Sequence, residues 1–312
     1  MRCLRTPDDR FARLPRFPFA PHHADVPDGD GGTLRMAWVE DGPADGPAVL
    51  LLHGEPSWSF LYRTMIPVLA AAGLRAIAPD LVGFGRSDKP AEIADHSFAR
   101  HVEWTRSLVF DVLGLRDVTL VGQDWGGLIG LRLVAEHPQR FAAVVAANTG
   151  LPTGDVDMPE IWWSFRRAVE KAEVLDVARL VASGCRTPFP PEIRAAYDVP
   201  FPDETFKAGP RAMPLLVPTR PDDPASAANR AAWEVLRELD LPFLCAFSDG
   251  DPITAGMRPV LIETMPGARG RAHPIIKGAG HFLQEDGGPE LASWVAELVS
   301  GLGRGRTPGA RR

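Results

Sequence analysis

A ten-residue segment, residues 118–127 (VTLVGQDWGG), places a carboxylate at the position where a nucleophile is expected. An apolar run leads into a Gly-x-Asp-Trp-Gly turn, and an apolar helical pattern follows as far as Pro138. This strand–turn–helix pattern is typical of a nucleophile elbow, in which a sharp turn lifts one side chain above the edge of a sheet. The central residue is Asp124, which would attack as an anion and leave an ester. Such chemistry indicates substitution at an alkyl carbon, followed by hydrolysis of the ester.

The glycines around Asp124 predict its backbone conformation. Gly122 and Gly126 flank a residue that we expect at positive φ, where a Cβ on either neighbour would collide with the adjoining strand or helix. Gly127 lets the helix begin close to the sheet, so that its free N–H groups point at the carboxylate. The alternative is that Asp124 only caps the helix.

A nucleophile of this kind needs a base, and the base needs a group that orients it. His281 lies between a glycine-rich turn (GAG, residues 278–280) and the start of a helix, a position from which its ring can reach across the sheet edge. The alternative for His281 is a capping or surface histidine. Asp249 and Asp251 both follow the preceding apolar run, and we favour Asp251 because the Asp-Pro step places it on the outgoing side of the turn. The alternative is an ordinary turn aspartate.

An early loop is the candidate for binding an oxyanion. Residues 53–58 (HGEPSW) follow the first apolar run. The main-chain N–H groups of Glu55 and of Trp125, the residue after the nucleophile, are predicted to hold the oxyanion that forms when the ester is cleaved. The alternative is a simple Gly-Pro turn.

These residues must be positioned by a sheet. Continuous apolar runs, typical of strands buried on both faces, occur at residues 49–52, 75–78, 118–121, 142–147, 243–247 and 274–276. Helical patterns lie between them, and strands that alternate with helices predict a doubly wound α/β architecture with a mostly parallel sheet. His53, Asp124 and Asp251 each follow a run, so they share the edge where ligands bind in such sheets.

The alternation stops between about residues 151 and 230. Helical stretches at residues 161–180, 191–197 and 225–239 are separated there by proline-rich turns, which predicts a helical cap over the active edge. We therefore expect the first part of the core at residues 1–150, the cap at 151–232, the second part of the core at 233–303 and a disordered Gly/Arg/Pro-rich tail at 304–312.

Composition excludes several classes of protein. The 312 residues are 45% hydrophobic and carry a net charge of −6, and no basic block precedes the tail, so nucleic acid is not expected as a partner. Three widely spaced cysteines predict reduced thiols in a cytoplasmic protein and show no metal-ligand spacing. The first 27 residues resemble neither a signal peptide nor a membrane span. We expect a monomer with no membrane partner.

Four motifs together closely resemble the haloalkane dehalogenases, which have the α/β-hydrolase fold with an inserted cap. The resemblance covers about residues 30 to 300, is weakest in the cap, and rests on residues 53–63 (HGEPSWSFLYR), 79–90 (PDLVGFGRSDKP), 122–127 (GQDWGG) and 278–285 (GAGHFLQE). The chain order of nucleophile, acid and histidine is that of α/β-hydrolases. One subgroup is closer, because its triad acid follows the strand before the histidine loop. The other has Asn after His-Gly and Glu after an earlier strand, where this chain has Glu55 and Asn148.

The resemblance implies hydrolysis of a haloalkane to an alcohol, a halide ion and a proton, with no metal or organic cofactor. Asp124 would displace the halide, and His281, oriented by Asp251, would activate water against the ester. Trp125 would bind the leaving halide through its indole N–H, which is only a donor. A cap tryptophan would supply the second N–H. We favour Trp163 for that role and expect its neighbour Trp162 to pack in the cap.

Two other functions remain as alternatives. Epoxide hydrolases share the fold and the aspartate nucleophile, but in that family two cap tyrosines act on the epoxide oxygen. This chain has two tyrosines in all, and only Tyr197 falls in the predicted cap, since Tyr62 belongs to the early loop. The second alternative is a ligand receptor on a hydrolase fold without turnover, which the intact nucleophile, base and acid disfavour.

Overall fold

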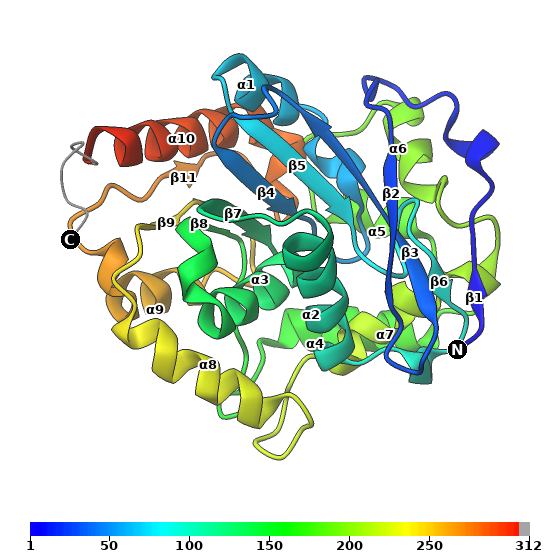
Figure 1. Cartoon of the computed structure of the whole chain (residues 1–312). Coiled ribbons are helices and arrows are strands. Elements are labelled where there is room, and N and C mark those ends of the chain that lie inside the picture. Colours follow the sequence, from blue (N-terminus) through cyan, green and yellow to red (C-terminus); the bar gives the residue numbers. More distant parts are fainter. Residues whose placement is uncertain (306–312) are drawn as a thin grey trace.

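A seven-stranded sheet forms the centre of the computed structural model, which describes residues 1–305 (Figure 1). The strand order is β2-β3-β5-β4-β7-β8-β9. Five strands run parallel: β4 (Ala48–Leu52), β5 (Arg75–Asp80), β7 (Val118–Gln123), β8 (Phe141–Ala147) and β9 (Phe243–Cys245). Each coincides with a predicted apolar run, because strands that are covered on both faces need apolar side chains on both. The doubly wound α/β architecture is therefore confirmed.

A hairpin at one edge of the sheet was not predicted. It consists of β2 (His22–Pro27) and β3 (Thr33–Asp41), and β3 pairs antiparallel with β5. Two short pairs lie outside the main sheet. In the first, β1 (Cys3–Leu4) pairs with β6 (Lys89–Pro90), and in the second, β10 (Phe247–Ser248) pairs with β11 (Ile275–Ile276).

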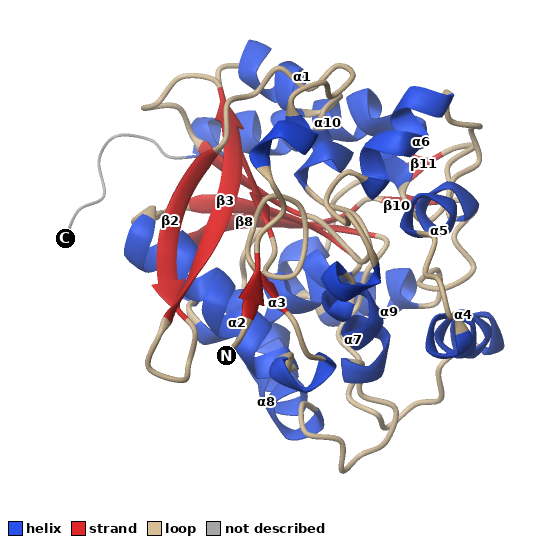
Figure 2. Cartoon of the chain, turned by 90° about the vertical axis from the view of Figure 1, so that its right-hand side faces the viewer, coloured by secondary structure: helices blue, strands red, loops and turns tan. Residues whose placement is uncertain are grey.

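Helices cover both faces of the sheet, as Figure 2 shows from the side. On one face, α1 (Ile66–Ala71) packs against α10 (Leu283–Gly305). On the other, α2 (Phe98–Arg106) and α8 (Ser226–Glu238) pack against α3 (Trp125–Glu136), and α9 (Met257–Thr264) lies near β9. Within residues 1–305, none of the helices combines the length and the apolar character that crossing a bilayer requires.

The segment between β8 and α8 contains four helices. They are α4 (Glu160–Lys171), α5 (Val177–Ser183), α6 (Pro191–Asp198) and α7 (Ala208–Leu216), with α5 against α6 and α4 against α7. The helical stretch predicted over residues 161–180 is two helices, because Asp176 caps α5 by accepting the N–H of Arg179 at 2.8 Å. Helix α7 was missed because its sequence contains Gly209, Pro210 and Pro214.

The division into core and cap stays a prediction. Its boundary at residue 232 falls inside α8, a helix that packs against α3 of the core. The tail predicted from residue 304 overlaps the end of α10, and residues 306–312 lie outside the described residues.

Residues 1–17, which we call the strap, contact two segments that are far apart in the sequence. On the core side, Arg5 pairs with Asp88 at 2.7 Å. On the other side, the Thr6 hydroxyl donates to the carbonyl of Pro200 at 2.6 Å, and Arg10 Nε donates to the carbonyl of Val199 at 2.9 Å. The strap thus joins the residues that follow α6 to the loop that follows β5.

Candidate active site

The turn between β7 and α3 holds Asp124 in a strained conformation. Its φ is 49° and its ψ is −123°, as the positive-φ prediction requires. A Cβ on Gly126 would lie 1.9 Å from the carbonyl oxygen of Leu52, and one on Gly122 would lie 2.7 Å from Gly127 Cα. Neither neighbour can therefore be larger than glycine. Asp124 is the N-cap residue of α3, but its side chain makes no capping hydrogen bond, which argues against a purely structural role.

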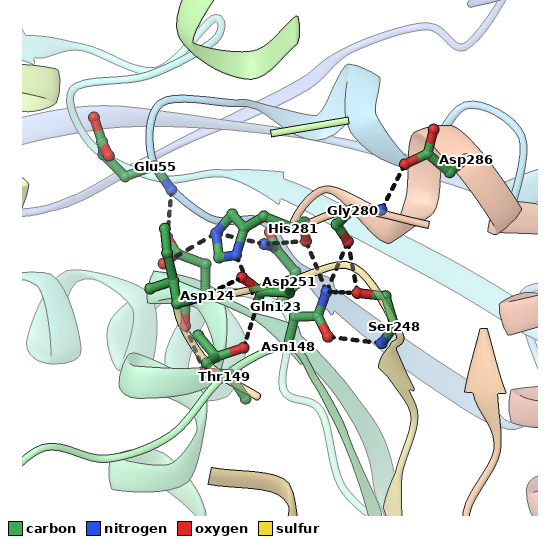
Figure 3. Close-up of polar contacts among 12 residues, drawn as sticks. Glu55, Gln123, Asp124, Asn148, Thr149, Ser248, Asp251, Gly280, His281 and Asp286 are labelled. Carbon is green, nitrogen blue, oxygen red and sulfur yellow. Dashed lines mark hydrogen bonds and ion pairs between the residues drawn. The ribbon is translucent and has the colours of Figure 1, made fainter. Parts of the chain in front are cut away.

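The Asp124 carboxylate is held from two sides (Figure 3). The main-chain N–H of Glu55 donates to Oδ1 at 2.9 Å. The other oxygen, Oδ2, lies 3.5 Å from His281 Nε2. One oxygen is therefore bound by a main-chain donor, while the other faces the imidazole.

His281 is joined to Asp251 on its other ring nitrogen. The Nδ1 atom lies 3.0 Å from Asp251 Oδ2, and the Asp251 side chain is fully buried. Asp251 also accepts the N–H of Ile253 at 2.9 Å and the hydroxyl of Thr254. Asp249, the alternative, instead accepts the N–H of Gly278 at 2.8 Å. The structure therefore brings Asp251, and not Asp249, to the histidine.

Charge couples these three residues. Burial alone lowers the pKa of His281, but the carboxylate of Asp251 and the hydrogen bond with Asp124 raise it above its ordinary value. Burial raises the pKa of Asp251, but the charge and hydrogen bond of His281, together with the hydrogen bonds from Thr254 and Ile253, bring it below its usual range. The neighbouring carboxylates thus favour the protonated form of His281.

Glu55 combines a main-chain donor with a neutral side chain. The residue is 5% exposed, and burial followed by the nearby charge of Asp124 raises the pKa of its carboxyl well above the ordinary value. The carboxyl points away from Asp124 in Figure 3. A neutral acid beside the nucleophile does not repel an anion that leaves there.

Two further residues organise the site, and neither role was predicted from the sequence. Gln123 Nε2 donates to the His281 carbonyl and lies 3.2 Å from His281 Nε2. The Asn148 backbone has a positive φ of 42°. Its side-chain Nδ2 donates to Ser248 Oγ and to the carbonyls of Gly280 and His281. Its main-chain carbonyl accepts the N–H of Asp124 at 3.1 Å. In the sequence, the only indication of these roles was position: Gln123 ends β7, and Asn148 directly follows β8.

The indole of Trp125 lies at the first position of α3, next to the nucleophile. It is 3% exposed and packs against the Phe98 ring, with 5.0 Å between centroids. In α4, Trp162 is buried in the hydrophobic core and Trp163 is half-buried, with their ring centroids 4.9 Å apart. The Arg166 guanidinium lies 5.5 Å from the Trp163 ring and 5.7 Å from that of Trp162.

Both tyrosines are fully buried and engaged elsewhere. The Tyr62 hydroxyl donates to the carbonyl of Leu52 at 2.7 Å. The Tyr197 hydroxyl donates to Glu285, which also pairs with Arg63. Neither hydroxyl is therefore available as an acid for an epoxide oxygen.

Comparisons with known proteins agree with this geometry. The family model described as alpha/beta hydrolase fold matches residues 47–288. A haloalkane dehalogenase of Psychrobacter cryohalolentis is 51% identical over 96% of this chain and 98% of that relative. Another, from Mycobacterium marinum, is 53% identical over 95% of this chain and 99% of its own length.

A solved structure is similar over nearly its whole length. The tetrameric haloalkane dehalogenase DpaA from Paraglaciecola agarilytica superposes with a TM-score of 0.87 and 36% identity, covering 94% of this chain and 97% of that one. The sequence of this chain is about half identical to those of the two curated relatives over almost its full length. The aspartate nucleophile motif and the fold agree with this relationship. The chain therefore belongs to the haloalkane dehalogenases, within the alpha/beta hydrolase fold.

Proposed function

We propose that the enzyme hydrolyses the carbon–halogen bond of a haloalkane through an alkyl ester on Asp124. In the first step, Oδ2 of Asp124 attacks the carbon in line with the halogen, the new C–O bond forms and the halide leaves with the bonding electrons. The observation that carries the proposal is the Asp124 carboxylate itself, at positive φ above the sheet edge, with one oxygen on the Glu55 N–H and the other facing His281.

In the second step, His281 first gives to solvent the proton that it carries in the free enzyme, and the neutral ring then removes a proton from a water molecule that attacks the ester carbonyl. Oδ1 then carries the negative charge of the tetrahedral intermediate, and the Glu55 N–H at 2.9 Å already lies on that atom. The N–H of Trp125 is at the first position of α3, where helical N–H groups have no partner within the helix. The intermediate collapses as the bond between the carbonyl carbon and the alkoxy oxygen breaks. That oxygen takes the proton of the newly added hydroxyl and leaves as the primary alcohol, the Asp124 carboxylate is regenerated, and His281 keeps the proton that it took from water.

Asp251 completes this arrangement by accepting Nδ1–H. It fixes the ring so that Nε2 faces the ester, and it stabilises the imidazolium that forms. Because Asp251 is fully buried and also accepts from Ile253 and Thr254, it stays ionised while the histidine cycles.

The leaving halide is assigned to two indole N–H groups, those of Trp125 and Trp163. An indole donor carries no fixed charge, so it can stabilise the departing anion and still release it. The half-buried state of Trp163 and the buried state of Trp162 support this choice between the two neighbours.

The oligomeric state, the cellular compartment and the substrate class are also part of this proposal. We infer a monomer that acts in the cytoplasm on small halogenated alkanes, although the similar DpaA is tetrameric. All three cysteines are free, which agrees with a reducing compartment.

One panel separates the candidate activities. The enzyme is incubated with 1,2-dibromoethane, 1-bromobutane and styrene oxide, and halide and diol are followed. Halide release without diol supports the proposal. Diol from styrene oxide would favour an epoxide hydrolase, and no product at all would favour a receptor. Asp124→Ala should abolish halide release, and turnover like that of the wild type in this variant would reject the mechanism.

A further inference from the structure

The carboxylate of Asp286 binds two segments that are far apart in the chain. Asp286 lies in the first turn of α10, five residues after His281. It accepts the N–H of Gly280 at 2.8 Å, and Gly280 is the residue that precedes His281 (Figure 3). It also accepts the N–H groups of Thr187 at 2.7 Å and of Arg186 at 3.0 Å, both in the connection between α5 and α6.

The same connection contacts the other side of His281. The N–H of Phe282 donates to the carbonyl of Gly184 at 3.2 Å. The fit is close, since a Cβ on Gly280 would lie 2.3 Å from the Gly184 carbonyl oxygen and one on Gly184 would lie 2.7 Å from the Phe282 ring. Both peptide neighbours of His281 are therefore fixed with respect to residues 184–187.

We propose that Asp286 is a positioning residue that couples the segment 184–187 to His281. The inference rests on the proposed role of His281 as the base of the second step. Three N–H donors converge on one carboxylate, and hydrogen bonds to a charged acceptor are stronger than neutral ones. Loss of that charge frees Gly280 to move, and the distance from His281 Nε2 to the ester then varies. Asp124 attacks without a proton transfer, so the first step does not depend on this contact.

The test is Asp286→Asn, because an amide has nearly the same shape but offers one acceptor oxygen and directs N–H groups at the remaining donors. With 1-bromobutane, rapid-quench samples are analysed by intact-protein mass spectrometry for the butyl-enzyme. We expect formation of the adduct at the wild-type rate and a decay slowed by roughly tenfold or more, a factor at the lower end of that for a lost charge-assisted hydrogen bond. Both kcat and KM should fall while kcat/KM is unchanged, because kcat/KM reports only the steps through alkylation.

Three further variants distinguish this coupling from a general loosening of the fold. Asp249→Asn removes the charge of the carboxylate that accepts the N–H of Gly278 in the same loop, and it should change neither rate. Asp286→Glu keeps the charge and should restore most of the decay rate. Gly184→Ala disturbs the contact from the other segment and should slow decay in the same way, even if the Asp286 variant does not fold.

The outcomes are distinguishable. If the wild type releases no halide, the proposed function fails before Asp286 is tested. If the wild type turns over and the butyl-enzyme of Asp286→Asn decays at the wild-type rate, Asp286 does not position His281. An equal loss of adduct formation and decay would mean that Asp286 only stabilises the fold.

Discussion

Alkylation of Asp124 should lower the pKa of His281, and this change decides when the histidine can act as a base. In the free enzyme the carboxylates of Asp251 and Asp124 raise the pKa of His281, so the ring is protonated at neutral pH. The ester is uncharged. Alkylation therefore removes the negative charge of Asp124, which lay 3.5 Å from His281 Nε2. Without that charge, the protonated form of His281 is less favoured.

The size of the fall follows from the distance. Two unit charges 3.5 Å apart interact by about 1 kcal/mol at the dielectric constant of water and by about 5 kcal/mol at an effective value near 20. At 1.36 kcal/mol for each pKa unit, the fall lies between about 1 and about 3.5. The Asp124 side chain is 21% exposed, so solvent screens the pair and we expect a fall of about 1 to 2.

Asp124→Asn reproduces the loss of charge without a substrate. The pKa of His281 is measured in both proteins from ring ¹⁵N shifts, with the resonance among the eight histidines assigned by its loss in His281→Gln. Mass spectrometry verifies that the asparagine has not deamidated. Asp249→Asn, which removes a carboxylate bound to Gly278, is the control and should leave the pKa unchanged. Equal pKa values in Asp124→Asn and the wild type would refute the coupling.

Three more predictions follow from the site. His281→Gln given 1-bromobutane should release about one halide per active site and stop, leaving one butyl group on a peptide that contains Asp124, because alkylation needs no base and hydrolysis does; steady turnover would mean that another base serves. Trp125→Phe and Trp163→Phe should each weaken bromide binding roughly ten- to a hundredfold, the equivalent of about 1.5–3 kcal/mol, as followed by quenching of tryptophan fluorescence; loss in Trp162→Phe with none in Trp163→Phe would reassign the ligand. Gly126→Ala should destabilise the protein by about 3 kcal/mol or more in urea unfolding, because its Cβ meets the Leu52 carbonyl, whereas Gly301→Ala, which faces open space in α10, should not destabilise it.

The parallel strands and the Asp124 turn could be predicted because local sequence determines them. A strand buried on both faces needs a continuous apolar run, and a residue at positive φ between close-packed elements needs small neighbours. The β2–β3 hairpin is an edge element with mixed polar and apolar residues, so it lacks such a run. Its signal was the glycine-rich turn between the two strands, at residues 29–32 (GDGG).

Contacts between distant segments could not be predicted in the same way. The preference for Asp251 over Asp249 agrees with the geometry, since the backbone turn sends the two carboxylates to different partners. Asn148 follows a predicted strand, but neither its role nor that of Asp286 could be predicted, because Asn148 bonds to Ser248 and Asp286 bonds to Arg186, each 100 residues away in the chain. Only the folded arrangement shows that an asparagine joins the nucleophile turn to the histidine loop.

The strap has a consequence for the order of events during folding. Its Thr6 hydroxyl donates to the carbonyl of Pro200 across 194 positions of sequence, so this contact closes a very long loop. A contact of such long range forms after local structure, because its loop must first be closed. We therefore expect the strap to dock last and, in the finished protein, to open before the sheet does. Proteolytic cleavage within the strap would then report how firmly it is docked on the residues that follow α6.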